Sequence, residues 1–340
     1  MPIKFLNIIY ILLLIFFTYL IFSFYKSNNL FANEILHDDK VSEEIRIINI
    51  TVFYDNINHK DVLISNLKNR FKEINNFYIK NFNIKWKILD LKYFNFNSDL
   101  INLSDIFTLY RDTLEKITLN SNSEVILGII TRPIRGKGIA STFSNFALIS
   151  SSDILKNSES SLVISHEFAH LFGAWHTRTK GDFMQINNYS KNPIVSNTNK
   201  QLMILMKNYN FNSNLVLKDK NLLKKISRLY KNNHMIGEID PVARLYTDYA
   251  YKSYSNKKYT EALINLKKSN EIHKRWHINT LLLAKTYFEL GLYDDSFVAY
   301  SRAIFYGSRV DIIFENKLKQ KFIDLQKNDS TINNPFIINN

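Results

Sequence analysis

The sequence predicts a mixed α/β domain followed by an all-α region, behind one N-terminal membrane-spanning helix. From about residue 45 to 236, strand-like and helix-like hydrophobic periods alternate, which is typical of an α/β domain with a mostly parallel twisted sheet. From about 237 to 326 the pattern is helical throughout and repeats itself. A chain of 340 residues is long enough for both parts.

The first element is an uncharged stretch, Phe5–Tyr25, interrupted only by Asn7, Thr18 and Ser23. Its length matches the roughly 20 residues that a helix needs to cross a bilayer. The sequence therefore predicts a transmembrane anchor, followed by a polar stalk over residues 26–44.

A cleavable signal peptide is the alternative for this stretch. Its apolar region would be shorter, about 7–15 residues, with a cleavage site of small residues behind it. Leu30–Ala32 could serve as that site, and the mature chain would then be secreted. The positive charges of Lys4 and Lys26 flank the apolar stretch almost symmetrically, so they give only a slight bias in orientation.

The α/β domain is expected to begin with strands and helices in alternation, joined by right-handed crossovers. Alternating or continuous apolar residues predict strands, and apolar residues three or four apart predict helices. The expected strands are 48–54, 84–88 and 125–130, and the expected helices are 63–78 and 106–117.

Residues 136–150 mix polar and apolar side chains, which suits an edge strand or an ordinary surface hairpin. A helix is predicted to begin near Ser158, a residue type favoured at helix N-caps, with its apolar residues packed under the sheet: Leu162, Val163, Phe168, Ala169 and Phe172. Two further helices, 197–207 and 214–231, are expected to form a small lower subdomain.

The segment HEFAHLFGAWH, from His166 to His176, carries the chemistry. Residues four apart share one helix face, so His166 and His170 can both reach one zinc ion. Glu167 lies about 100° further round the helix, where it can act as general base toward a water molecule instead of ligating. Gly173 allows the chain to turn back, so that His176 can supply the third ligand.

A bare HExxH pattern arises by chance, and a histidine cluster can also be a structural metal site. Structural zinc sites usually close the fourth position with Cys or His. The chain has no cysteine, and its other histidines lack ligand spacing. The residues therefore favour a catalytic site that binds one zinc ion per chain and hydrolyses peptide bonds.

The pattern HExxHxxGxxH resembles the signature of the metzincin metallopeptidases. Met184, eight residues past His176, stands where that clan has a methionine in a tight turn beneath the metal, as floor and not as ligand. This connection resembles those of matrixins and archaemetzincins in length, and Thr177 is matrixin-like. The resemblance implies that an edge strand near 136–150 lines the cleft and receives an extended substrate.

Some features of the clan are missing. Neither Gln185 nor Ile186 is the tyrosine that follows the methionine turn in astacins and serralysins, so no tyrosine ligand is expected. The absence of cysteine departs from archaemetzincins and from reprolysin-like enzymes. Trp175 and Phe183 are expected to support the site by packing, and Tyr189 is a candidate for stabilising the oxyanion.

The helical region repeats at a period of about 34 residues and resembles tetratricopeptide repeats. Gly291 opens the expected turn of the second repeat. A groove for a partner protein and a simple helical support are both compatible with this pattern. After residue 327 a disordered tail is expected. The aligned pairs are Ala250 with Ala284, Tyr259 with Tyr293, Ala262 with Ser296, Leu266 with Tyr300, and Ser269 with Ala303.

The formal net charge of +13 comes from lysines dispersed along the chain, without a long basic run or a nucleic-acid motif. No nucleic-acid partner is expected. The sequence thus predicts a membrane-anchored zinc endopeptidase that acts on peptides or proteins outside the cytoplasm. The alternative is a tethered interaction protein that uses the helical repeats and keeps a residual or structural zinc site.

Overall fold

The computed structural model describes residues 44–55, 60–96, 99–118, 122–132, 134–150, 159–186, 190, 192–211, 213–233, 238–331 and 334–336. Arg46–Asn340 is one compact unit, and Met1–Ile45 is assigned to another. The expected anchor at 5–25 and nearly all of the stalk lie outside the described residues. Among the helices that are described, none is long and apolar enough to span a membrane.

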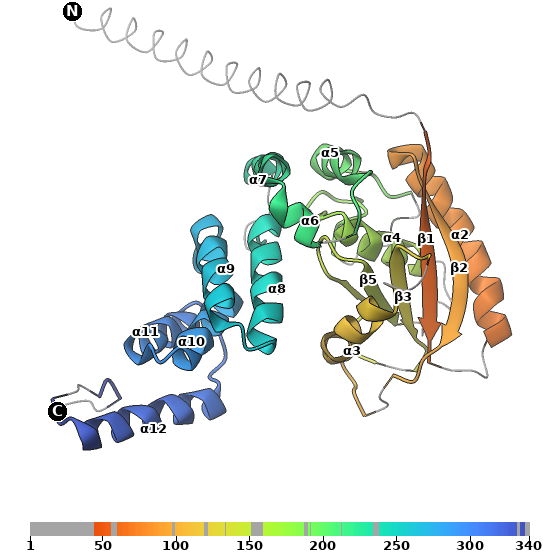
Figure 1. The fold of residues 1–340 in the computed structure, drawn as a ribbon. Helices are drawn as coiled ribbons and strands as arrows, with labels where there is room; N and C mark the ends of the chain where they lie inside the picture. Colours follow the sequence, from red (N-terminus) through yellow and green to blue (C-terminus); the bar gives the residue numbers. More distant parts are fainter. Residues whose placement is uncertain are drawn as a thin grey trace, which may run out of the picture. The chain divides into compact units, whose positions relative to one another are not determined.

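A five-stranded sheet forms the centre of the α/β part, in the order β2-β1-β3-β5-β4 (Figure 1). The first four strands in this order run parallel, and β4 pairs antiparallel with β5 at the edge, which confirms the expected mostly parallel sheet. All six residues of β3 are buried, as expected for a strand covered on both faces. The strands are β1 (Arg46–Tyr54), β2 (Ile84–Tyr93), β3 (Val125–Ile130), β4 (Gly138–Ala140) and β5 (Phe146–Ser150).

Helices cover both faces of this sheet: α2 (Lys60–Phe82), α3 (Leu103–Thr118) and α4 (Glu159–Leu171). On one face, the ring of Phe107 in α3 stacks on Phe146 of β5, with centroids 5.0 Å apart. On the other face, the ring of Phe168 in α4 lies 4.1 Å from that of Trp86 in β2. The helix that carries the histidine motif is therefore fixed to the sheet by large aromatic side chains.

An amide side chain ties α2 to β2. Asn75 donates from Nδ2 to the Trp86 carbonyl (3.0 Å) and accepts at Oδ1 from the Trp86 N–H (2.7 Å). The amide thus satisfies both backbone groups of one strand residue, as a neighbouring strand would.

The segment 136–150, expected as an edge strand or a hairpin, is a hairpin of two antiparallel strands. β4 is the edge, but β5 lies inside the sheet with all five residues buried. In α4, Phe168, Ala169 and Phe172 are buried as predicted. The predicted core positions Leu162 and Val163 are only half-buried, and the neighbouring Ile164 is buried in their place.

The helix expected at 197–207 is α5 (Asn197–Met206). The single helix expected at 214–231 is instead two helices, α6 (Ser213–Lys218) and α7 (Lys220–Asn233). The break falls at Asp219, whose carboxylate accepts from the Leu222 N–H (2.9 Å) and so caps α7.

The C-terminal region is helical: α8 (Pro241–Ser255), α9 (Tyr259–Ile272), α10 (His277–Glu289), α11 (Tyr293–Phe305) and α12 (Ile312–Asn328). The first four form two hairpins at the expected spacing, and in both the small residues of the aligned pairs are buried. Lys257 and Gly291, which stand one repeat period apart, both have positive φ in the turns (60° and 77°). Membership in the tetratricopeptide family stays a prediction.

A buried polar network joins the two hairpins. The Thr247 hydroxyl donates to Oδ1 of Asn279 (2.8 Å) and lies 2.8 Å from the Ser269 hydroxyl. Nδ2 of Asn279 donates to the Leu266 carbonyl (3.3 Å). These bonds connect α8, α9 and α10 in the interior of the region.

The expected disordered tail contains residues that pack. Asn334 is buried, and the ring of Phe336 lies 5.0 Å from that of Phe297 in α11 and 6.1 Å from that of Phe322 in α12.

Candidate active site

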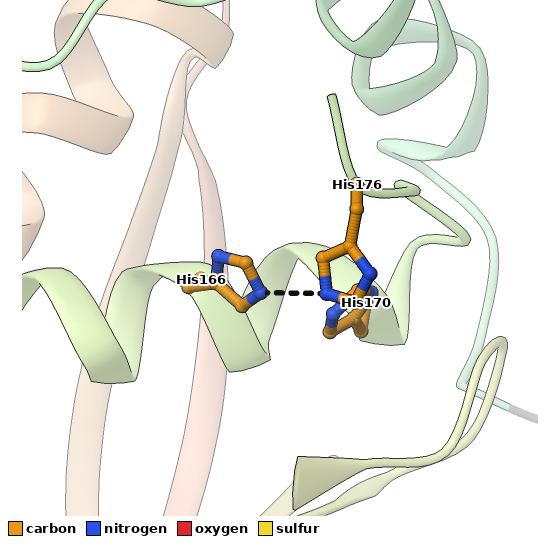
Figure 2. Close-up of side chains that lie close together, drawn as sticks. All are labelled: His166, His170 and His176. Atoms are coloured by element: carbon orange, nitrogen blue, oxygen red, sulfur yellow. Dashed lines mark hydrogen bonds between the residues drawn. The ribbon is translucent and has the colours of Figure 1, made fainter. Parts of the chain in front are cut away.

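Two histidines of α4 and one histidine beyond its end gather at one point (Figure 2). One possible ligand atom from each of His166, His170 and His176 lies within 4.8 Å of the others. Nε2 of His166 and Nε2 of His176 are 3.2 Å apart. Two ligands of a tetrahedral zinc with bonds of about 2.0–2.1 Å would lie roughly 3.3–3.4 Å apart, so the donor set fits this ion.

Each of the three imidazoles has an acceptor at Nδ1. That of His166 lies 2.9 Å from the Phe183 carbonyl, and that of His170 lies 2.7 Å from the Ala174 carbonyl. Because a carbonyl oxygen only accepts, these nitrogens carry the proton and Nε2 is left as ligand atom. Burial also lowers the pKa of His166 to about 4 and lowers that of His170, which favours the neutral form that a metal requires.

His176 has a different acceptor. Its Nδ1 lies 3.4 Å from Oε2 of Glu238, a residue of the segment that leads into α8. A carboxylate in this position holds the ring and raises its basicity as a metal ligand. The sequence reasoning did not find Glu238, because it is distant from His176 along the chain and no pattern links the two.

Gly173 makes the expected turn after α4. Its φ is 90°, and its N–H donates to the His170 carbonyl (2.8 Å). A Cβ atom here would also lie 2.2 Å from the ring of Phe143. The positive φ and this close contact therefore each require glycine.

The segment from this turn to His176 is held by Asn199 of α5. Oδ1 of Asn199 accepts from the Trp175 N–H (3.3 Å), and its Nδ2 donates to the Trp175 carbonyl (3.0 Å). Asn199 is fully buried, and Trp175 is packed against Tyr230 with ring centroids 5.4 Å apart. Trp175 thus supports the third histidine by packing, as expected.

Glu167 lines the same pocket as His170 and His176, and its side chain is buried. This burial raises the pKa of its carboxyl to about 8. Gly138 of the edge strand β4 lies against it, since a Cβ atom there would be 2.5 Å from Oε1 of Glu167. Sequence reasoning did not single out Gly138, although a glycine in a short strand signals a close approach of this kind.

Met184 is buried, and it lies in a turn that Asp182 stabilises. Oδ1 of Asp182 accepts from the Met184 N–H (2.7 Å), and its other oxygen accepts from the Ser196 N–H. The Met184 carbonyl in turn accepts from the N–H of Thr177 (3.2 Å), which joins this turn to the residue after His176. Phe183 is buried as expected, and Tyr189 lies outside the described residues.

A pocket of about 170 Å³ opens at these groups. One wall is β4 and another is the end of α4, and the residues after the expected domain boundary at 236 complete it. These are Glu238, Ile239, Pro241 and Arg244, so the start of the helical region forms part of the site. A larger hollow of about 870 Å³ is lined by residues of α2 and α4, by Ser190 and by residues 192–195.

No protein-family model and no curated protein matches this chain. Among solved structures, an archaemetzincin from Methanopyrus kandleri is 13% identical with a TM-score of 0.36, covering 49% of this chain and 97% of that one. A zinc-dependent peptidase from Methanocorpusculum labreanum is 13% identical with a TM-score of 0.33, covering 45% and 99%.

A chain of a chaperone–substrate complex is 16% identical with a TM-score of 0.34, covering 46% of this chain. This chain spans about a third of that one (31%). Likenesses of this size establish neither a family nor an activity. Function is therefore inferred from the residues of the site.

Proposed function

We propose that this chain is a membrane-anchored, zinc-dependent endopeptidase. One observation carries the proposal: three histidines converge on one point, each with an acceptor at Nδ1, beside the buried carboxyl of Glu167. His166, His170 and His176 would hold one zinc ion per chain, with Met184 as the floor. Such a donor set leaves a fourth position for water, which distinguishes catalytic from structural sites.

A bound zinc ion supplies Lewis-acid activation of the attacking water. Its positive charge would lower the pKa of Glu167 again, so that the carboxylate can act as base. Glu167 takes a proton from the water as its oxygen attacks the peptide carbonyl. It then gives this proton to the amine nitrogen as the C–N bond breaks. β4 ends the strand order, so its outer edge can bind an extended peptide by strand addition.

The test is Glu167→Gln. This variant should retain zinc, because Glu167 is not a ligand, and should lose peptide cleavage at least about 100-fold. Zinc content and cleavage of a mixed peptide library are measured together. Glu271→Gln, an exposed carboxylate of α9, is the matched control and should change neither. Cleavage at the wild-type rate by Glu167→Gln would contradict the proposed mechanism.

The anchor and the location belong to the same proposal. The uncharged Phe5–Tyr25 stretch supports a single span with the peptidase outside the cytoplasm. Protease added to intact cells should digest the peptidase while a cytosolic marker survives. Full protection would contradict the orientation, and release of a soluble chain beginning near Asn33 would favour the secreted alternative.

An interaction protein is the second candidate function. It is favoured by apolar side chains exposed where α11 leads into α12: Phe305 (86% exposed), Ile312 (67%) and Ile313 (73%). In that case the zinc-loaded chain would cleave no peptide. The wild-type and Glu167→Gln chains would then be indistinguishable in the assay above.

A further inference from the structure

The pocket at the histidines has one cationic wall. Arg244 lines it together with Glu167, His170 and His176. Pro241 also lines it, and because residues three apart share a helix face, the first turns of α8 present one side to the pocket.

The guanidinium of Arg244 has no hydrogen-bonded partner within the part of the chain that the structure describes. No hydrogen bond or ion pair reaches it, and only its backbone N–H is bonded, to the Asp240 carbonyl (2.9 Å). The acidic groups nearby are not hydrogen-bonded to this guanidinium. The charge of Arg244 acts on the Asp248 carboxylate, which accepts from the Ser141 hydroxyl (3.4 Å), and the Glu238 carboxylate faces the third histidine.

Arg244 is half-buried, and its guanidinium has N–H donors without an acceptor among the described residues. Its planar fork of five N–H donors matches a carboxylate in two parallel hydrogen bonds. A carboxylate brought by a ligand can satisfy these donors.

The size of the pocket limits what carries this carboxylate. About 170 Å³ is below the roughly 300–1,000 Å³ typical of ligand pockets, and Pro241 and Arg244 of α8 are part of its lining. The end of a peptide, or one acidic side chain, fits such a space better than a long segment of chain.

We propose that Arg244 binds a carboxylate of the peptide substrate, so that this site selects peptides with a negative charge next to the cleaved bond. The inference rests on the proposed peptidase function. The carboxylate is either a Glu or Asp side chain or the C-terminus of the peptide, in which case the enzyme removes residues from the end of a chain instead of cutting within it.

The experiment uses the full-length chain loaded with zinc and four peptides of one sequence. They combine a free or amidated C-terminus with either Glu or Gln at the position next to the cleaved bond. The wild type should prefer one of the two carboxylates by about tenfold or more in kcat/KM. Arg244→Gln should abolish this preference mainly by raising KM, and Arg244→Lys should keep part of it. Arg302→Gln, an exposed arginine of α11, is the control and should behave as wild type.

The outcomes separate the two proposals. If the wild type cleaves acid and amide forms equally, or Arg244→Gln lowers kcat equally for all four peptides, carboxylate binding is overturned. If no peptide is cleaved, the peptidase proposal fails. Fluorescence anisotropy of the same four labelled peptides with Glu167→Gln then still measures whether Arg244 gives a carboxylate preference in binding, and equal affinities overturn it.

Discussion

The two helical hairpins share a framework and differ where the first one reaches the metal pocket. Both bury small residues at the aligned positions, and both turn through a residue with positive φ. Yet one repeat period after Arg244 stands Ile278, which is 53% exposed, and one repeat period after Glu238 stands Ile272. The repeat pattern therefore describes how the helices pack. Of the two hairpins, only the first, together with the segment that leads into it, supplies polar groups to the pocket.

The largest effect expected from this difference is on metal binding. Glu238→Ala removes the acceptor at Nδ1 of His176 and should lower zinc affinity about 10–100-fold. Competition with a chelator of known affinity measures it. Glu238→Gln should lose less, since its amide oxygen can still accept. Glu271→Ala is the control, and unchanged affinity in Glu238→Ala would show that the first hairpin has no role in the metal site.

The junction between the hairpins should matter for stability and not for metal. Asn279→Ala removes the acceptor of the buried Thr247 hydroxyl in α8 and the donor to the Leu266 carbonyl in α9, and should lower the free energy of unfolding by roughly 1–3 kcal/mol. Denaturant unfolding measures this, with the exposed neighbour Ile278→Ala as control. Weaker zinc binding in Asn279→Ala would show that the packing between the hairpins also affects the pocket.

The smallest effect is expected in the turns. Gly291→Lys should cost about 1–2 kcal/mol of folding stability, because a side chain at positive φ is strained. Lys257→Gly at the equivalent position should cost nothing, or stabilise by up to about 1 kcal/mol. Thermal unfolding of both variants decides the point. Equal destabilisation by both would mean that the two turns are not equivalent.

Local patterns predicted much of this molecule. The spacing of His166, His170 and His176 follows from helix geometry and one glycine turn, and the repeat period located both hairpins. The sequence could not reveal Glu238 or Arg244, because their place in the site comes from how α8 packs and not from any local pattern. The break at Asp219 was missed because the apolar period continues through it, although an aspartate there is also a helix-start signal.

The paired hydrogen bonds of Asn199 and Asn75 have a consequence for the ageing of the molecule. Each amide offers one donor and one acceptor to the backbone of a tryptophan. Deamidation to aspartate would keep the shape but turn the donor into an acceptor, facing a carbonyl that already accepts. At Asn199 this change would remove the hydrogen bond that fixes the segment before His176. The position of the third histidine would then depend on the chemistry of one buried amide.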